Sequence, residues 1–458
     1  MHQTVVLNVV GLTGSLLGAH TPQLTRFARD GISCPIETVT PAVTCTVQST
    51  FLTGRPPSGH GIVANGWYFR DLAQVWFWRQ SNHLVEGEKV WEAARRRDPE
   101  FTCAQMFWWY NMYSQADFAA TPRPAYPADG RKIFDIYTEP PELRVRLKRE
   151  LGEFPFFSFW GPKAGLPSSE WIAAAGRRVF DWEAPSLTLI YLPHLDYNLQ
   201  RLGPDDPAIA RDLAQIDGIC GALIDHFQER GARVIVLSEY GITPVNGVVH
   251  INRVLREAGL IRIREELGLE QLDAGASEAF AVADHQLAHV YVRAPERVAQ
   301  VKALLEQVPG IEQVLGEQEK AAYHLNHPRT GDLVAISEPD KWFSYYYWLD
   351  DRLAPDFART VDIHRKPGFD PTELFVDPKL RLPLLKVGKT LLKKSLGFRY
   401  LMDVIPLDAG LVKGSHGRVT GDPLHGPVFM TSEARLVQGP TVKAAQVKQL
   451  MLDHLFED

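Results

Sequence analysis

Residues 187–237 read LTLIYLPHLDYNLQRLGPDDPAIARDLAQIDGICGALIDHFQERGARVIVL, and this stretch decides the fold. Leu187–Leu192 and Val234–Leu237 are apolar, β-branched runs, as expected of strands that are buried on both faces. The segment between them repeats apolar side chains at helical spacing. Such alternation predicts a parallel sheet covered by helices, in which side chains just past the strands line the ligand crevice. Asp196 and Glu239 hold those positions.

A similar unit lies at the N-terminus. Val5–Val10 is an apolar run that predicts a first buried strand, and residues 21–29 carry the start and stop signals of a helix. Between Ala281 and Ile336, shorter strand and helix patterns predict a small α+β subdomain. We therefore expect three parts, which are an α/β core in residues 1–280, an inserted cap subdomain in 281–350, and a connection that returns to the core in 351–458.

Composition excludes several classes of protein. The chain has 458 residues with 49 basic and 55 acidic side chains, which gives a formal charge of −6. The basic residues are scattered, so the sequence offers no electrostatic footprint for nucleic acid. No apolar run reaches the roughly 18 residues that predict a membrane span. The four cysteines are far apart and lack metal-binding spacing, which favours a reducing compartment, and we expect a cytoplasmic protein.

One basic segment near the C-terminus is amphipathic. Residues 386–399 read KVGKTLLKKSLGFR. We expect a solvated surface helix here, with contact to a membrane surface or to phosphate as the alternative. The triplet Gly388-Lys389-Thr390 is not a phosphate loop, because Pro383 stands where that loop has its leading glycine.

Four motifs follow one another in a recognisable order. Residues 40–65 read TPAVTCTVQSTFLTGRPPSGHGIVAN and come after the first strand and the helix TPQLTRFARDG. The later motifs are LIYLPHLDYNLQRLGPD (189–205), VIVLSEYGIT (234–243) and GSHGRVTGDPLHGPVFM (414–430). In this order they resemble the alkaline phosphatase superfamily, and within it the type I phosphodiesterase and nucleotide pyrophosphatase branch. The resemblance implies an alkaline-phosphatase-like α/β fold, with a mostly parallel sheet sandwiched by helices and a small inserted α+β cap.

The resemblance also implies a site. In that family, metal ions activate a Thr or Ser nucleophile and neutralise the phosphate oxygens. Carried over by position, Thr44 is the nucleophile and Asn65 is a side-chain amide donor to a phosphate oxygen. Asp196 and His416 match two ligands of the first metal, and Glu239 keeps the carboxylate of another ligand.

Three ligand positions have changed type. Val10 stands where the family has an Asp, although Asn8 lies on the same face of the strand, and Gln200 and Tyr240 stand where the family has His. The remaining donors are mostly hard oxygens with one imidazole, which suits Mg²⁺ or Mn²⁺ better than Zn²⁺. A divergent site with one or two of these divalent ions is expected, and loss of the metal is the alternative. The predicted ligands are Asp196, Gln200, Glu239 and His416.

Aromatic side chains are dense in three clusters of the sequence. Trp108, Trp109 and Tyr113 are candidates to stack on a flat part of the substrate, with core packing as the alternative. Nucleotide-cleaving relatives have an aromatic residue directly after the nucleophile, where this chain has Cys45. This difference weakens the case for a nucleotide and leaves room for another phosphorylated metabolite.

A histidine pair lies in the run FAVADHQLAHVYV at residues 280–292. His285 and His289 are four residues apart and therefore share a face in a strand as well as in a helix. They are candidates to supply imidazoles that the main site lacks. Hydrogen-bonding roles unrelated to a metal are the alternative.

These observations favour one function over a second. The leading hypothesis is a cytoplasmic, metal-dependent hydrolase of phosphoric esters in which Thr44 attacks a small phosphorylated metabolite. The alternative is a catalytically impaired protein of the same fold that binds a phosphate ligand, which the changed metal ligands favour. Both hypotheses have a small phosphorylated molecule as the partner, and neither involves nucleic acid or a membrane span.

Overall fold

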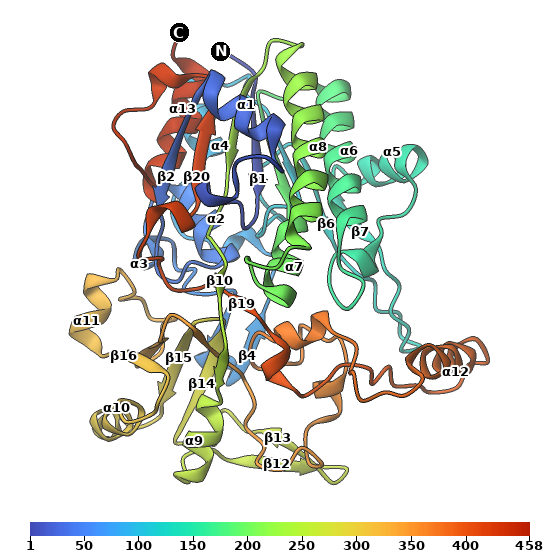
Figure 1. The fold of residues 1–458 in the computed structure, drawn as a ribbon, viewed down its shortest axis with the longest axis vertical. Coiled ribbons are helices and arrows are strands. Elements are labelled where there is room, and N and C mark those ends of the chain that lie inside the picture. The colour runs from blue at the N-terminus through green and yellow to red at the C-terminus, as the bar shows by residue number, and fades with distance from the viewer.

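The computed structural model describes residues 1–458 and is built on a nine-stranded sheet. The strands are β1 (Thr4–Val9), β2 (Ile32–Glu37), β5 (Cys103–Met106), β6 (Phe118–Pro122), β7 (Ile136–Glu139), β8 (Leu187–Leu192), β9 (Arg233–Leu237), β20 (Val428–Thr431) and β21 (Val442–Lys443). Their order is β21-β2-β20-β9-β1-β8-β5-β6-β7 (Figure 1). Strands β9, β1, β8, β5 and β6 run parallel, whereas β20 is antiparallel to both of its neighbours. The prediction of a mostly parallel sheet is confirmed.

Helices flank the large sheet in two groups (Figure 1). One group consists of α1 (Pro22–Asp30), α6 (Leu166–Glu183) and α8 (Ile209–Gln228), of which α6 packs on β8, α8 on β9, and α1 on β2 and β20. The other consists of α2 (Thr44–Thr53), α4 (Val90–Arg97) and α13 (Val447–Phe456), which contact one another through α13. Helices α1 and α8 occupy the segments where helical spacing was predicted. The helix-covered α/β architecture is therefore confirmed.

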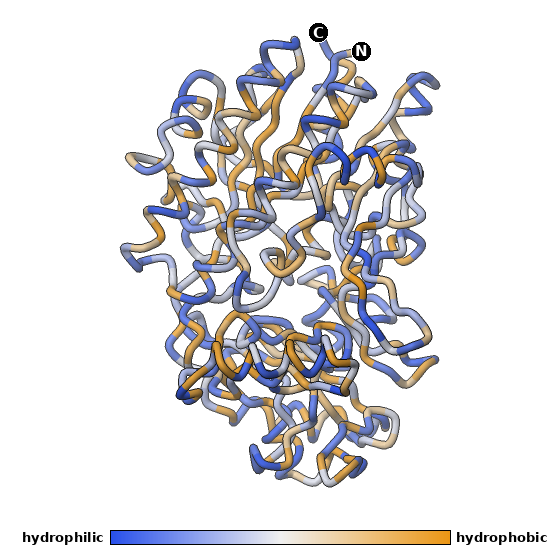
Figure 2. The backbone as a smooth tube through the Cα atoms, turned by 90° about the vertical axis from the view of Figure 1, so that its right-hand side faces the viewer, coloured by the Kyte–Doolittle hydropathy of each residue, from blue (hydrophilic) through white to orange (hydrophobic).

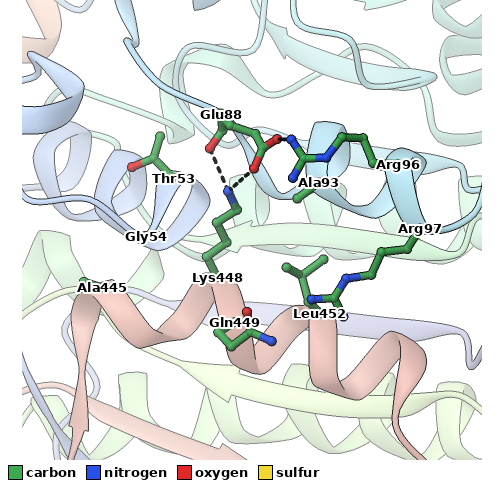
Figure 3. A pocket seen from close by; sticks show the side chains of 10 residues that line it. All are labelled: Thr53, Gly54, Glu88, Ala93, Arg96, Arg97, Ala445, Lys448, Gln449 and Leu452. Carbon is green, nitrogen blue, oxygen red and sulfur yellow. Dashed lines mark hydrogen bonds and ion pairs between the residues drawn. The ribbon is translucent and has the colours of Figure 1, made fainter.

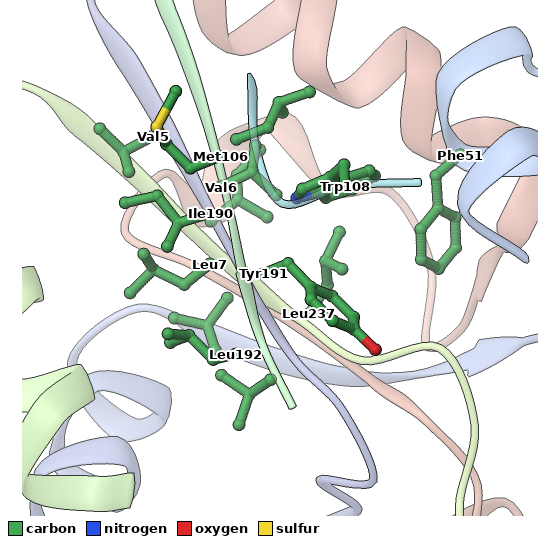
Figure 4. Packing of buried hydrophobic residues seen from close by; sticks show 14 of the residues in the cluster. Val5, Val6, Leu7, Phe51, Met106, Trp108, Ile190, Tyr191, Leu192 and Leu237 are labelled. Carbon is green, nitrogen blue, oxygen red and sulfur yellow. The ribbon is translucent and has the colours of Figure 1, made fainter. Parts of the chain in front are cut away.

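A core of 67 buried residues joins this sheet to its helices. In β8 the side chains alternate, so that Ile190 and Leu192 point to one side and Tyr191 to the other (Figure 4). Every residue of β1 and β8 is buried, which explains why these strands read as continuous apolar runs rather than alternating ones. Figure 2 shows the same feature as hydrophobic stretches that run through the middle of the upper body.

A second unit lies below the large sheet in Figure 1. It contains an antiparallel sheet in the order β14-β15-β17-β16, made of β14 (Ala279–Asp284), β15 (Leu287–Val292), β16 (Ile311–Leu315) and β17 (Leu333–Ser337). Its core of 34 buried residues draws on the chain from Val245 to Val412 and includes Phe77. The second unit thus extends beyond the predicted segment 281–350 at both ends.

The remaining elements are short. They are the helices α3 (Pro57–His60), α5 (Pro141–Leu151), α7 (His194–Leu202), α9 (Ile251–Glu257), α10 (Val298–Leu305), α11 (Glu317–Ala322) and α12 (Pro383–Ser395), and the strands β3 (Gly66–Phe69), β4 (Gln74–Phe77), β10 (Thr243–Pro244), β11 (Gly247–Val249), β12 (Ile263–Glu266), β13 (Leu269–Leu272), β18 (Lys341–Phe343) and β19 (Gly414–Ser415). None of the helices combines the length and the apolarity that crossing a bilayer requires. All four cysteines are free and buried.

Candidate functional site

Helix α2 begins at Thr44 and is buried along its whole length although most of its side chains are polar. The hydroxyls of Ser49, Thr50 and Thr53 donate to the backbone carbonyls four residues earlier, at 2.7, 3.0 and 2.7 Å. These bonds satisfy the hydroxyls inside the helix, so a Thr- and Ser-rich segment can be buried. The helix ends at Gly54, whose φ of +67° is the left-handed conformation that glycine adopts easily.

The hydroxyl of Thr44 lies at the carboxyl ends of the central strands. Its Oγ1 is 3.0 Å from the hydroxyl oxygen of Tyr240, which follows β9. The hydroxyl of Tyr240 lies 3.2 Å from Asp196 Oδ1 and donates to it when Asp196 is ionised, in which case Thr44 is the donor to Tyr240. Asp196 Oδ2 accepts from Gln200 Nε2 at 2.8 Å, one turn further along α7. A continuous hydrogen-bonded chain therefore runs from Thr44 to Gln200.

The carboxylate of Glu239 is the second acidic group of this centre and is completely buried. Its Oε1 accepts 2.6 Å hydrogen bonds from Asn8 of β1 and from Gln48 of α2. No Lys or Arg makes an ion pair with Glu239 or Asp196, whereas burial disfavours their charged forms. Burial raises the pKa of Glu239 to about 8 and that of Asp196 to about 7.

His416 reaches the same place from the far end of the chain. It follows β19, which pairs with β10 just after β9, and its Nδ1 lies 2.8 Å from the carbonyl oxygen of Ala42. Its ring stacks on Tyr240 at 3.6 Å on one side and contacts His285 at 3.7 Å on another. Burial lowers the pKa of His416 to about 3, so the imidazole is neutral.

Asn65 connects helix α2 to the second unit. Its Oδ1 accepts the backbone N–H of Cys45 at 3.0 Å and so satisfies one free donor at the start of α2. Its own N–H and its Nδ2 donate to the two oxygens of Asp284, at 2.7 and 3.1 Å. Asp284 ends β14 and is completely buried, and burial raises its pKa to about 7.

The side chains of this centre include unpartnered donor atoms of the kind that bind a divalent cation. Four buried acceptor atoms have no hydrogen-bond partner, namely Asn8 Oδ1, Gln200 Oε1, Glu239 Oε2 and His416 Nε2. They are three oxygens and one imidazole nitrogen, which is a donor set for a hard or borderline cation. No group of three or more His, Cys, Asp or Glu side chains is placed to hold a metal, so any cation there depends on the amide oxygens too.

The predicted substrate-binding aromatics occupy different environments. Trp108 is completely buried in the main core, where its ring lies near Phe51 (Figure 4), and its role as a substrate contact stays a prediction. Trp109 donates its backbone N–H to Gln48 Oε1 at 2.7 Å, and its ring packs on Trp78 at 4.7 Å. Tyr113 is 58% exposed and makes no contact with the residues around Thr44.

The structure thus brings together Thr44, Asn65, Asp196, Gln200, Glu239 and His416, as predicted from a family resemblance. It also draws in His285, whereas His289 bonds to the carbonyl of Val63 and plays a local structural role. Asp284 lies beside His285 in the histidine run, and Trp78 belongs to one of the three aromatic clusters. Gln48 was missed as part of the centre, although it lies one helical turn after Thr44 and therefore on the same face of α2.

A surface pocket of about 310 Å³ lies away from this centre, at the C-terminal end of α2. In Figure 3 the carboxylate of Glu88 lies between Lys448 and Arg96, and Arg97 lines the same pocket. Because α2 is ten residues long, this pocket is about 15 Å from Thr44. It is therefore separate from the candidate site.

Residues 4–370 match the model of the type I phosphodiesterase/nucleotide pyrophosphatase family, and the chain belongs to this family. Over 258 residues it is 26% identical to an uncharacterized pyrophosphatase/phosphodiesterase of Schizosaccharomyces pombe. That match covers 53% of this chain and 45% of the yeast protein, so the chain spans less than half the length of this relative.

Two solved structures share the fold over almost the whole chain. Phosphonoacetate hydrolase from Sinorhizobium meliloti, in complex with phosphonoacetate, has a TM-score of 0.62 at 15% identity, covering 99% of this chain and 96% of that one. Murine ectonucleotide pyrophosphatase/phosphodiesterase 5, an inactive threonine-to-alanine variant in complex with AMP, has a TM-score of 0.59 at 15% identity, covering 99% and 95%. The likeness confirms the alkaline-phosphatase-like fold.

The buried Asp284 predicts a dependence of stability on pH. Its folded-state pKa of about 7 lies above the ordinary value of 3.8, so the unfolded chain loses this proton first as the pH rises. The free energy of unfolding should therefore fall between pH 4 and pH 7, with a share from Asp284 of up to about 1.4 kcal/mol per pH unit. Asp284→Asn should make this slope less steep in urea unfolding. A variant curve parallel to the wild-type curve would contradict the assignment, since loss of a hydrogen bond alone shifts both ends equally.

Proposed function

We propose that this chain is a phosphoric-ester hydrolase in which Thr44 is the nucleophile and a small phosphorylated molecule is the substrate. The observation that carries the proposal is the hydrogen-bonded chain from Thr44 through Tyr240 to Asp196, at the first turn of a buried helix. A hydroxyl is a weak nucleophile unless a neighbouring group takes its proton. The chain gives that proton a path towards Asp196.

The surroundings of Thr44 suit a phosphoryl group. The start of α2 carries unsatisfied backbone N–H groups and the positive end of the helix dipole, which together favour an anion. Asn65 accepts the backbone N–H of Cys45. Its side-chain amide has a second hydrogen besides the one that it donates to Asp284. Attack by Thr44 on phosphorus would form a phosphothreonine and release the leaving oxygen. Water would then break the new bond and restore the hydroxyl.

A single divalent cation, Mg²⁺, Mn²⁺ or Zn²⁺, is part of the proposal, held by Asp196, Gln200, Glu239 and His416. When bound, it would supply positive charge to the phosphoryl oxygens. The orphaned atoms of Gln200, Glu239 and His416 and the absence of a cationic side chain beside the carboxylates support this assignment. Trp109 and Trp78 form the adjacent aromatic wall, and Tyr113 is proposed as an outer contact for a longer substrate.

The printed descriptions of the two similar structures support the same chemistry. One is a hydrolase bound to a phosphonate, and the other is inactivated by replacing a threonine with alanine and binds AMP. Both therefore hold a small phosphorus-containing anion. The buried free thiols are consistent with the proposed cytoplasmic location of this chain.

One observation favours a second candidate, a protein that binds a phosphate ligand without hydrolysing it. The hydroxyl of Tyr240 contacts both Thr44 and Asp196, and its ring covers one face of His416. A tyrosine in this position links the hydroxyl of Thr44 to the carboxylate of Asp196 but does not bind a metal strongly. The experiments below separate the two candidates.

Removal of the nucleophile tests the leading proposal. Thr44→Ala should lower the turnover of p-nitrophenyl phosphate mono- or diesters at least about a hundredfold, because it removes the hydroxyl that would form the covalent intermediate. Thr44→Ser keeps a hydroxyl and should retain part of the activity. Thr53→Ala is the matched control, since it changes a buried Thr at the other end of the same helix. Equal activity in Thr44→Ala and wild type would end the assignment, and a wild type that binds inorganic phosphate without turnover favours the second candidate.

Tyr240→Phe tests the hydrogen-bonded chain. The substitution keeps a ring that can stack on His416 and removes only the hydroxyl that joins Thr44 to Asp196. We expect kcat to fall by about 10- to 100-fold with KM nearly unchanged, because substrate contacts remain while the path for the proton is lost. A rise in KM alone would assign Tyr240 to substrate binding instead.

Binding of a cation can be measured without activity. Mn²⁺ added at about 100 times its dissociation constant should stabilise the protein by about 2.7 kcal/mol in thermal unfolding. Glu239→Gln should lose most of this gain, because it removes the buried carboxylate. Glu317→Gln removes an exposed surface carboxylate and should keep the gain. Equal stabilisation of both variants would place the cation elsewhere.

A further inference from the structure

Helix α12 presents its apolar side chains to solvent. It stands out from the lower unit at the right of Figure 1, and of its thirteen residues only Thr390 is buried. Leu384 is 86% exposed and Leu392 is 59% exposed. An ordinary surface helix turns its apolar stripe to the core and its polar face to water. In α12 the apolar stripe faces water instead.

The exposed leucines form one face of the helix. At about 100° per residue, Leu384, Leu385, Leu391 and Leu392 fall within an arc of about 120°. Thr390 lies on the opposite side, where the helix contacts the protein, and Lys386 near it bonds to Asp403 at 2.8 Å. The chain adds further exposed apolar side chains at both ends of the helix, which are Leu382, Leu396, Phe398, Tyr400 and Leu401. We call these residues and the four leucines the α12 apolar face.

Basic residues surround this face without acidic ones. Residues 378–402 contain seven Lys and Arg side chains and no Asp or Glu. The whole chain has a formal charge of −6, so this segment concentrates charge of the opposite sign in one projecting place. Lys389, Lys393 and Lys394 have no ion-pair partner, whereas Lys386 is paired with Asp403. Six of the seven positive charges are therefore free to meet an anionic surface.

We propose that α12 and its flanks are an interfacial anchor that binds the surface of an anionic lipid bilayer. Leucines and aromatic side chains on one face would enter the boundary between headgroups and acyl chains, and the basic side chains at its edges would meet the lipid phosphates. Association of two copies through this face would bring two clusters of seven like charges together, which is unfavourable. The α12 apolar face is convex and projects from the protein. A lipid bilayer suits it as a partner because a bilayer can deform around a projecting helix.

Binding to vesicles tests this inference with the full chain. Wild-type protein should sediment with phosphatidylcholine vesicles that contain phosphatidylserine and stay in solution with pure phosphatidylcholine. Added salt should weaken the binding, because it screens the charges. Without vesicles, sedimentation velocity should give the same oligomeric state for the wild type and for the variant Leu391→Ser/Leu392→Ser.

Two sets of variants separate the charge from the apolar face. Lys389→Gln/Lys393→Gln/Lys394→Gln should lower the partition coefficient on the order of a hundredfold. Leu391→Ser/Leu392→Ser should lower it at least about tenfold. The matched control, Arg149→Gln/Arg264→Gln/Arg352→Gln, makes the same change in net charge at exposed side chains elsewhere. This control should bind like wild type, and unchanged thermal midpoints show that all variants fold.

Three outcomes would overturn the proposal. The first is wild-type protein that stays in solution with phosphatidylserine vesicles. The second is equal binding by the lysine variant and the arginine control, which would mean that net charge alone acts. The third is a wild type that self-associates and becomes monomeric on replacement of the leucines, which would assign the face to a second copy. Each result is independent of hydrolytic activity, so this test and those of the proposed function cannot be confused.

Discussion

The burial of Glu239 constrains the rest of the site. Its carboxylate accepts amide hydrogens from Asn8 of β1 and Gln48 of α2, and both bonds are 2.6 Å long. These short bonds fix the first turns of α2 against the carboxyl ends of β1 and β9. Because α2 is held close to these strand ends, Thr44 lies beside Tyr240. Neutral donors compensate a buried charge only in part, which is why the pKa of Glu239 remains raised to about 8. Positive charge placed beside Glu239 would therefore compensate its buried carboxylate more fully than these amides do.

Much of this arrangement could be predicted from the sequence. Strands buried on both faces read as unbroken apolar runs, and their alternation with helices indicates a parallel sheet. Because the carboxyl ends of parallel strands meet at one edge, Asp196 and Glu239 had to lie close together. Thr44 and His416 do not directly follow one of these parallel strands, so the same rule does not place them. They were predicted only because four motifs in order resemble a family.

Other parts of the site leave no local signal. Gln48 meets Glu239 across 191 residues, and Asn65 meets Asp284 across 219. Spacing along α2 places Gln48 on the same face as Thr44, but it cannot indicate which distant side chain either Gln48 or Asn65 meets. Trp108 and Trp109 are neighbours in a loop without periodicity, yet the first is core and the second packs on Trp78. The core of the second unit includes residues outside 281–350, and the polar hairpin of β12 and β13, which lies before that segment, gives a weak strand pattern.

The connection that carries α12 is firmly held, although it contains little regular structure. Lys366 is buried and pairs with Asp370 and Glu373 at 2.8 and 2.7 Å, so one cation balances two carboxylates inside the protein. Phe369, between them, stacks on His285 at 3.8 Å and so joins this segment to the wall of the candidate site. Breaking a buried, hydrogen-bonded pair is costly, which keeps this part of the connection in one place. Helix α12 follows this anchored segment and turns its apolar face outward.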